Sequence, residues 1–574
     1  MSEKVHKIIQ INDLKDMLEK SGRIYGSRPA YKLRTEIKGE YKIITHAEAR
    51  ENINYLGTAL IKMGLKRRRI AVISENRYEW GLSYLAIACG TGIVVPLDKS
   101  LPENEIQSLI ERSGVEAAIF SNKYLDIFKK IKQKGVGKLK NLISMDLEDH
   151  EDGIYSLNKL LEKGKKLVEE KDESFINAKI DAKSMGIMLF TSGTTALSKA
   201  VMLSHSNICA NLMDIASVLE VNERDILLSF LPLHHVFECT TGFLYPLYKG
   251  ACVVYCDGIR HIQENLAEYH VSAMVSVPIL YESMYRRIIK AIEKQGKLKK
   301  VEKGVKISSS LKKLHIDIRK QIFKEIHEKL GGNIRLFISG AAALDPDIEK
   351  GYNDLGIRIA QGYGLTEASP VIAAGSDFNY KHGSIGKILP SIKARINKPD
   401  ENGIGELVVK GPNVMLGYYN NEEETRKVLR DGWLYTGDLA KIDEEGFVFI
   451  LGRKKSVIVL KNGKNVFPEE LENLVNKIEG VKESLVYGKP EDGDERDPKV
   501  CVKIVYDTEI MKEMYKIEEE KEIDEFFVSK IKDINKTIPT YKYMKEVTIT
   551  TEELIKTTTA KIKRHEEIKK LLNK

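Results

Sequence analysis

The stretch IAVISENRYEWGLSYLAIACGTGIVVPL, residues 70–97, decides the fold class. The apolar runs at 70–74 and 92–97 have the length of buried strands, and the segment between them, 78–89, is typical of a helix. A second predicted helix at 102–113 and a strand at 117–120 repeat the pattern. Strands that alternate with helices of this length form βαβ units. The sequence therefore predicts an α/β fold whose large N-terminal domain contains mostly parallel sheets.

Similar apolar runs follow at 225–230, 251–255, 273–278 and 335–340. After Ile392 the strands become short and are broken by Asp-Glu-Asn-Gly, which favours an antiparallel, β-rich subdomain. A last segment combines its own strands with amphipathic helices and predicts a small α+β domain. Because 574 residues exceed one typical core, we expect two domains, 1–452 and 453–574.

The composition is that of a globular protein and excludes several classes. With 91 Lys and Arg against 83 Asp and Glu, the net charge of +8 is too mild to indicate a nucleic-acid partner by itself. The six cysteines lack the spacing of a zinc site and are expected to be free thiols in a reducing compartment. The N-terminus does not resemble a signal peptide, and no apolar run approaches the ~20 residues that span a bilayer. We expect a cytoplasmic protein, with peripheral membrane contact left open.

One segment is unusually basic. Between Arg286 and Lys324 there are fourteen Lys and Arg residues but three acidic ones, and apolar residues recur beneath the charges at helical spacing. Leu311, Leu314, Ile318 and Ile322 belong to this expected buried face. The segment is either a solvated helical excursion or a patch that attracts anionic lipid or the phosphates of a large substrate.

The run LFTSGTTALSKAVMLSH, residues 189–205, indicates a phosphate-binding turn. An apolar strand leads into four hydroxyl side chains around a glycine, followed by Lys199. Hydroxyls, backbone N–H groups and a cation suit the oxygens of a polyphosphate. A Walker A loop is the rival interpretation, but Ser198 and Ala200 stand where it requires glycine and Ser or Thr.

Four further clusters are weak alone and informative together. SGAAAL (339–344) offers small residues against which a flat ring can lie, and QGYGLTEASP (361–370) combines an aromatic ring, a hydroxyl and a carboxylate. YTGD (435–438) ends in a carboxylate suited to a ribose diol, and KTTTAKIKR (556–564) sets hydroxyls beside lysines. Taken singly, each cluster is also compatible with an ordinary turn or a solvated face.

In this order, the motifs resemble those of the adenylate-forming superfamily, which includes acyl-CoA synthetases, firefly luciferase and peptide-synthetase adenylation domains. The resemblance runs from about Asp13 to Arg564. Within the superfamily, LPLHHVFE (231–238) and the basic insertion before RLFISGAAAL are most similar to bacterial long-chain fatty acid–CoA ligases. The resemblance implies activation of a fatty acid by ATP to acyl-AMP, release of pyrophosphate, and transfer to CoA, with Mg²⁺ as cofactor.

The resemblance also implies a role for each motif. The β- and γ-phosphates are assigned to Thr191, Ser192, Gly193, Thr194, Thr195 and Lys199. The rest of the nucleotide is assigned to Ala341, Ala342, Ala343, Tyr363 and Gly364 for adenine, Asp438 and Arg453 for ribose, Thr366 for the α-phosphate, and Glu367 for Mg²⁺. Lys561 is assigned to the bridge between the carboxylate and the α-phosphate, His235 to the acyl carbonyl, and Phe237 to the acyl tunnel. The hinge between the domains is assigned to Lys455, and the CoA channel to Lys461 and Gly463.

The chain departs from the family pattern at several positions. Ala196, Ser198 and Ala200 replace glycine, proline and glycine of the phosphate loop, and alanine does not readily adopt a positive φ. In the last motif, Ile555 and Ala560 replace proline and glycine. Alternatives of the same fold are an acyl carrier protein synthetase and an aryl-CoA ligase, and a non-catalytic lipid or nucleotide sensor is an alternative of another class. Acyl chain length and oligomeric state do not follow from the sequence.

Overall fold

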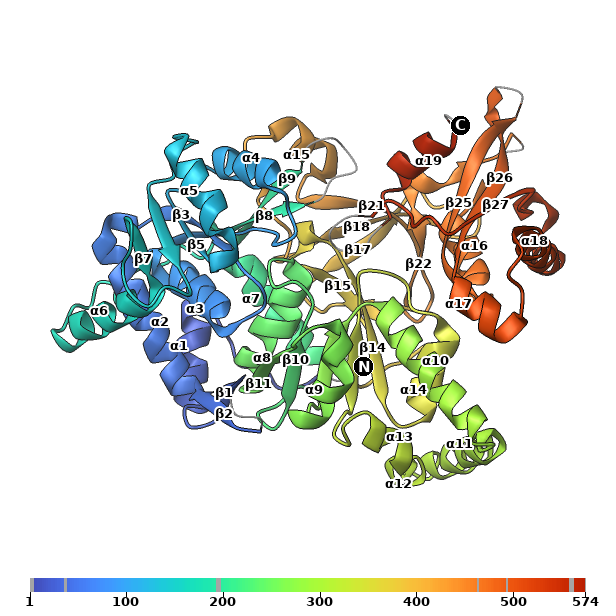
Figure 1. The fold of residues 1–574 in the computed structure, drawn as a ribbon, viewed down its shortest axis with the longest axis horizontal. Helices are drawn as coiled ribbons and strands as arrows, with labels where there is room; N and C mark the ends of the chain where they lie inside the picture. Colours follow the sequence, from blue (N-terminus) through green and yellow to red (C-terminus); the bar gives the residue numbers. More distant parts are fainter. Residues whose placement is uncertain are drawn as a thin grey trace.

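The computed structural model describes residues 5–35, 39–191, 198–461, 464–491, 494–556 and 562–572. Two large mixed sheets form the N-terminal part (Figure 1). The first has the order β16 (Lys387–Ile388), β15 (Val371–Ala374), β14 (Arg358–Gly364), β13 (Leu336–Ser339), β12 (Ala273–Ser276), β10 (Ile226–Ser229), β11 (Cys252–Tyr255), β1 (Pro29–Arg34), β2 (Tyr41–Thr45). The second has the order β19 (Gly417–Tyr418), β9 (Lys199–Ser204), β8 (Met185–Thr191), β4 (Gly92–Pro96), β3 (Arg68–Ile73), β5 (Ala117–Phe120), β6 (Asn141–Ser144), β7 (Ile154–Ser156).

The inner strands of both sheets are parallel, and antiparallel pairs lie toward the edges. In the first sheet β1, β11, β10, β12, β13 and β14 run parallel to their neighbours, whereas β2, β15 and β16 are antiparallel. In the second, β8 pairs in parallel with β4 but antiparallel with β9. The predicted mostly parallel α/β fold is therefore confirmed.

Helices cover both faces of each sheet, which explains why the strands are continuously apolar. The helices of the N-terminal part are α1 (Leu14–Ile24), α2 (His46–Leu60), α3 (Tyr78–Ala86), α4 (Glu103–Ser113), α5 (Leu125–Gln133), α6 (Leu157–Glu169), α7 (His205–Val218), α8 (Tyr245–Tyr248), α9 (Ile262–Glu268), α10 (Pro278–Lys294), α11 (Leu298–Lys312), α12 (Arg319–Ile322), α13 (Lys324–Lys329), α14 (Pro346–Asp354) and α15 (Glu422–Val428). On β3, Ile70 and Val72 join a core shared with α2, α3 and α7, while Ala71 and Ile73 face a core with α4 and α5. This alternation is the period of a strand buried on both sides.

The region after Ile392 forms the antiparallel sheet that the sequence predicts. Its strands are β17 (Lys393–Asn397), β18 (Gly405–Lys410), β20 (Leu429–Arg430), β21 (Trp433–Ile442) and β22 (Val448–Arg453). Every pairing within this sheet is antiparallel. The sheet carries Asp438 and Arg453 on neighbouring strands, opposite each other in register.

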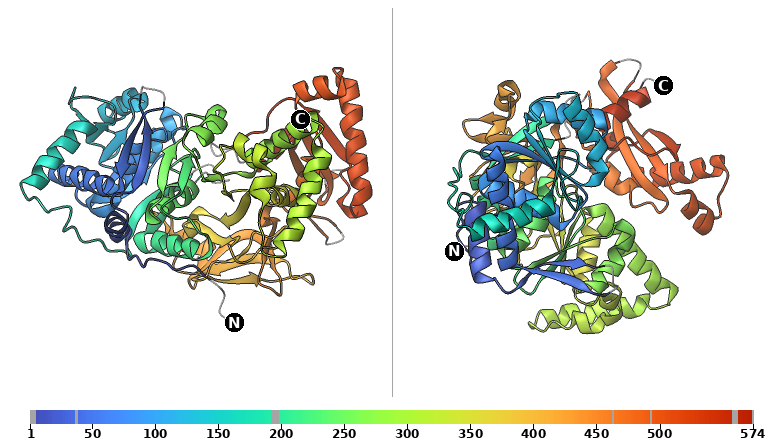
Figure 2. Two further views of the ribbon diagram at one scale, coloured as in Figure 1. Left: turned by 90° about the horizontal axis from the view of Figure 1, so that it is seen from below. Right: turned by 60° about the vertical axis from the view of Figure 1, so that its left-hand side comes forward.

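The C-terminal segment packs around a core of its own and lies beside the N-terminal sheets (Figures 1 and 2, orange to red). It contains β23 (Ile458–Val459), β24 (Asn465–Val466), α16 (Pro468–Val475), β25 (Val481–Glu491), β26 (Asp494–Tyr506), α17 (Thr508–Ile510), α18 (Glu520–Thr537), β27 (Glu546–Thr550) and α19 (Arg564–Leu572). Val466, Leu471, Val502 and Phe527 are completely buried in that core. Among the described residues, no helix has both the length and the apolar character to cross a membrane.

The basic segment is helical, but its predicted buried face is partly wrong. Ile288 and Ile292 of α10 are buried, whereas Leu314 is 68% and Ile322 is 37% exposed. The chain leaves the helix after Lys312 and turns through His315, whose φ is +62°, so the helical period no longer places Leu314 against the body. The cysteines are free, and all except the half-buried Cys256 are buried.

Candidate active site

The candidate residues of three motifs, 231–238, 339–344 and 361–370, lie where parallel strands of the first sheet end. The loop 230–238 follows β10, the SGAAAL stretch begins at the end of β13, and Thr366 and Glu367 follow β14. Because β10, β12, β13 and β14 are mutually parallel, their carboxyl ends lie at one edge of the sheet. Ligands of open α/β sheets bind at this kind of edge.

The base of the proposed phosphate loop is held by strand pairing and by one arginine. Thr191, the last residue of β8, pairs with Lys199, the first residue of β9. Beside them, the guanidinium of Arg112 on α4 donates hydrogen bonds to the backbone oxygen and, at 3.2 Å, to the hydroxyl of Ser198. Ser192, Gly193, Thr194 and Thr195 lie outside the described residues.

Tyr418 connects Lys199 with Glu367. Its hydroxyl donates a 2.7 Å hydrogen bond to Oε1 of Glu367, and Nζ of Lys199 lies 5.0 Å from the centre of its ring. Burial, reinforced by the Glu367 charge, raises the pKa of Tyr418, so this hydroxyl remains a donor. Lys199 also forms an ion pair with Glu424 on α15, and the hydrogen bond from Lys199 lowers the pKa of Glu424 to about 2.

The small-residue loop after β13 is open to solvent on one side and packed on the other. Ala341, Ala342 and Ala343 are all exposed. Ala341 has a φ of +72°, a conformation that costs a residue with a Cβ about 1 kcal/mol or more and often marks functional loops. A Cβ at Gly340 would lie 2.6 Å from Cζ of Phe237, so the absence of a side chain there lets the Phe237 ring pack against the loop.

Tyr363, Asp438 and Arg453 form a connected group. The Tyr363 hydroxyl donates a hydrogen bond to Asp438, and Nε of Arg453 pairs with the other Asp438 oxygen at 2.9 Å. Asp438 is only 4% exposed, whereas the Arg453 side chain is half-exposed. Burial raises the pKa of Tyr363 well above its ordinary value. The group presents a fixed carboxylate and an accessible guanidinium beside Gly364, which is exposed at the end of β14.

The segment after β10 enters a π-helical turn, η4 (Glu238–Leu244). His235 is half-buried just before it, and Phe237 is buried. Glu238 is completely buried, and that burial raises its pKa to about 8. His234 lies 3.5 Å from Asp98, measured from Nε2 to Oδ2, and burial lowers its pKa to about 4. At pH 7, Glu238 is therefore mostly protonated and His234 is neutral in the segment that follows β10.

The C-terminal motif residues lie on two connected turns. Lys455 is exposed in the turn η7 (Lys454–Ser456) directly after β22, and Lys461 is exposed after β23. Gly463 and Lys561 lie outside the described residues. The segment that contains Lys561 is flanked by a β-bridge between Lys556 and Ile562, and Arg564 binds Glu472 of α16.

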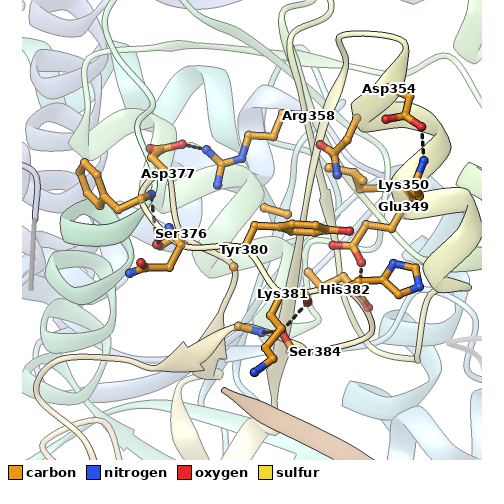
Figure 3. Close-up of a pocket in the computed structure, with 18 of the residues that line it drawn as sticks. Glu349, Lys350, Asp354, Arg358, Ser376, Asp377, Tyr380, Lys381, His382 and Ser384 are labelled. Atoms are coloured by element: carbon orange, nitrogen blue, oxygen red, sulfur yellow. Dashed lines mark hydrogen bonds and ion pairs between the residues drawn. The ribbon is translucent and has the colours of Figure 1, made fainter. Parts of the chain in front are cut away.

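A separate cavity of about 870 Å³ lies beside the opposite end of β14 (Figure 3). It is bordered by α14, the start of β14, the loop 375–386 and residues near the end of α11, and the predicted site residues are not among those that line it. Arg358 pairs with Asp377, Lys350 with Asp354, and Lys381 with Asp443. Lys312 and Lys313 also line the cavity and form no ion pair within the described part of the chain, so its charges are balanced only in part.

Sequence reasoning missed Tyr418, Glu424 and Arg112. Tyr418 and Glu424 lie in the stretch between β18 and β20 of the antiparallel sheet. The antiparallel pairing of β19 with β9 brings Tyr418 opposite Val201. The stretch GYYNNEEE (417–424) has the composition of a surface turn, so no local pattern marks it. The one signal in the sequence is Lys199 itself, because a partly buried ammonium group requires an acidic partner such as Glu424.

Comparisons with known proteins identify the family and the fold. The AMP-binding enzyme family matches residues 18–419. The chain is 28% identical to long chain acyl-CoA synthetase 7, peroxisomal, of Arabidopsis thaliana over 503 residues, covering 83% of this chain and 70% of that protein. It is 26% identical to the long-chain-fatty-acid–CoA ligase of Salmonella typhimurium over 512 residues, covering 83% of each chain.

Solved structures share the fold across both parts of the chain. The anthranilate CoA ligase AuaEII in complex with anthranoyl-AMP superimposes with a TM-score of 0.76 at 19% identity, over 98% of this chain and 97% of that one. A Mycobacterium tuberculosis fatty acyl CoA synthetase gives a TM-score of 0.65 at 21% identity, over 97% and 98%. The chain belongs to the AMP-binding enzyme family of the adenylate-forming superfamily and resembles its long-chain acyl-CoA synthetases.

Proposed function

We propose that this protein is a fatty acid–CoA ligase that acts on medium- to long-chain acids. The observation that carries the proposal is a set of contacts between residues of three sheets: Tyr418 links Glu367 with Lys199 at the base of the loop, and Tyr363 binds Asp438, which pairs with Arg453. These groups have the chemistry that a nucleoside triphosphate requires: oxygens for a metal and a diol, and donors for phosphates.

In the first step, a carboxylate oxygen of the acid attacks the α-phosphorus of ATP, the bond to the bridging oxygen breaks, and pyrophosphate leaves. Because two anions must approach, cations and hydrogen-bond donors stabilise this transition state. We assign Thr191, Lys199 and the residues 192–195 to the leaving pyrophosphate, and Thr366 to the α-phosphate. Lys561 is assigned to the bridge between carboxylate and α-phosphate, where a flexible ammonium group suits a residue that enters and leaves.

The residues around Glu367 fit Mg²⁺. One Glu367 oxygen accepts from Tyr418, and the described residues supply no hydrogen-bond partner to the other. A single carboxylate together with phosphates and waters is the usual magnesium environment. When bound, Mg²⁺ supplies charge neutralisation at the phosphates. The Tyr418 hydroxyl orients the Glu367 carboxylate and Lys199 lies over the Tyr418 ring, so the groups assigned to Mg²⁺ and to the phosphates share one support.

In the second step, the sulfur of CoA attacks the acyl carbonyl carbon and AMP leaves. We assign Ala341–Ala343 and Tyr363 to the adenine, Asp438 and Arg453 to the ribose, His235 to the acyl carbonyl, and Phe237 to the wall of the acyl tunnel. The boundary between domains 1–452 and 453–574 serves as a hinge at Lys455, and Lys461 and Gly463 line the CoA channel after rotation. The independent core of the C-terminal segment supports such a movement.

The test is pyrophosphate release with a panel of carboxylic acids, each with and without CoA. We expect release with laurate, palmitate and oleate, and acyl-CoA formation when CoA is present. Acyl transfer only to an acyl carrier protein, or release only with benzoate-type acids, would favour the two alternative ligases. If no acid causes pyrophosphate release but ATP or a fatty acid still binds, the protein is a non-catalytic sensor and the proposed ligase function is wrong.

A further inference from the structure

The tip of the helical excursion exposes aliphatic side chains among lysines. We define the hairpin tip as residues 306–324, the end of α11, the turn and α12. Its exposed apolar residues are Ile307 (46%), Leu314 (68%), Ile316 (49%) and Ile322 (37%). They are four of the fifteen large apolar side chains exposed among the described residues, gathered within nineteen positions. Such clustering is unusual for a surface that meets only water.

The charge of the hairpin tip has one sign. It contains six Lys and Arg residues and one acidic residue, Asp317. Asp317 is neutralised by Arg319, its neighbour two residues on. Within the part of the chain that the structure describes, no ion pair involves Lys306, Lys312, Lys313 or Lys320. The unneutralised cations therefore stand among the exposed aliphatic groups.

The hairpin tip is nevertheless fixed to the body of the protein. The Arg319 guanidinium donates to the backbone oxygen of Asn353 at the end of α14, and Phe323 is buried beneath α12. Gly304 lets α11 pack closely against α12, because a Cβ at this position would lie 2.9 Å from Cγ2 of Ile322. Figure 1 shows α11 and α12 at an outer corner of the molecule. The exposed aliphatic groups are thus presented by an anchored element.

We propose that the hairpin tip docks on the surface of an anionic lipid bilayer. Leu314 and Ile316 enter the interface, and the surrounding lysines contact lipid phosphates. Aliphatic side chains flanked by lysines on a projecting element are the composition of interfacial membrane contacts, and cations near the surface add attraction to anionic lipids. An acidic protein partner is the other class of occupant. The exposed apolar residues of the hairpin tip are aliphatic and include no aromatic anchor, which favours a deformable bilayer over a protein interface.

The inference is independent of the proposed function, because docking needs no turnover. The experiment is flotation of the full chain with vesicles of phosphatidylcholine containing phosphatidylglycerol, or of phosphatidylcholine alone. We expect binding to the anionic vesicles that weakens at high salt, and little binding to the neutral ones. Leu314→Ser/Ile316→Ser and Lys313→Glu/Lys320→Glu should each reduce the partition coefficient about tenfold or more.

Matched controls carry the same chemical changes at other exposed positions. Ile259, 72% exposed, is replaced by Ser, and Lys165 and Lys166 of α6 are replaced by Glu; these proteins should float like the parent. Unchanged thermal unfolding of every variant shows that folding is intact. Absence of flotation at low salt, or equal flotation of the hairpin variants and the controls, would overturn the proposal. In that case an acidic protein becomes the occupant to test.

Discussion

The hydroxyl of Tyr418 donates to Glu367 at 2.7 Å while the ring of the same residue lies under Lys199. One side chain thus supports the carboxylate assigned to Mg²⁺ and the ammonium assigned to the leaving phosphates. The side chain that contacts both polar groups belongs to β19 and lies more than fifty residues away from each of them in sequence.

Replacement of Tyr418 by Phe removes the hydrogen bond and keeps the ring beneath Lys199. We expect adenylation to fall about tenfold to a hundredfold with a higher Mg²⁺ requirement, since a hydrogen bond to a charged group contributes roughly 1.5–3 kcal/mol. The measurement is pyrophosphate release against Mg²⁺ concentration. Tyr419→Phe, which loses a 2.8 Å bond from Arg69, is the matched control. Equal behaviour of the two variants would remove Tyr418 from the site.

Lys561→Ala should abolish adenylation from acid and ATP but largely spare transfer of supplied acyl-AMP to CoA. The reason is that the ammonium group stabilises the approach of two anions, which occurs only in the first step. The two half-reactions are measured separately, with Lys563→Ala as the control. Survival of both half-reactions would show that another residue bridges the carboxylate and the phosphate.

Asp438→Asn should weaken nucleotide binding more than it weakens acid binding. The neutral amide loses the ion pair with Arg453 and one acceptor for the ribose, which together predict an increase in KM for ATP of about tenfold. The KM for palmitate should change little. A comparable increase in both constants would indicate a general loss of structure, which thermal unfolding also detects.

The buried Glu238 predicts a pH-dependent stability. Its pKa is raised from 4.5 to about 8, so the folded state keeps a proton that the unfolded chain releases above pH 4.5. The free energy of unfolding therefore declines as pH rises from about 5 to 8, by up to roughly 1.4 kcal/mol per pH unit from this group.

Glu238→Gln removes that titration while keeping the shape of the side chain. We expect the Tm of the variant relative to the parent to increase steadily between pH 5 and pH 8. Glu105→Gln, at an exposed position on α4, should leave this difference flat. A constant difference for Glu238→Gln would mean that the carboxyl is ionised in the folded protein.

Lys477 joins the C-terminal segment to α14, with Nζ 3.3 Å from Asp345 and 3.0 Å from Asp347. A contact made in one orientation of the segment stabilises that orientation alone. Lys477→Ala should therefore shift the two half-reactions in opposite directions, each by no more than about fivefold, because exposed ion pairs contribute at most about 1 kcal/mol. Lys542→Ala, whose partner Glu470 lies within the segment, should shift neither. Parallel loss of both half-reactions would contradict the proposed hinge.

The strands were predictable because they are buried on both faces. The apolar runs at 70–74 and 117–120 became β3 and β5 within two residues of the expected ends. The antiparallel sheet after Ile392 also followed from its turn residues.

Relationships between distant strands were not predictable in this way. The contact of Tyr418 with Glu367 depends on how β19 pairs with β9, which no local pattern encodes. The exposure of Leu314 depends on where α11 ends, and helix ends are the least certain part of a periodic pattern. Roles such as that of Lys561 came from resemblance and stay predictions.

The separate core of residues 458–549 has a consequence for heat inactivation. Polar contacts such as those of Lys477 join the segment to α14, so its cooperative unfolding is coupled only weakly to that of the two large sheets. A calorimetric scan should then show two transitions instead of one. Adenylation, for which Lys561 is proposed, should be lost in the transition that unfolds the C-terminal segment. The temperature of inactivation can therefore differ from the temperature at which the two large sheets unfold.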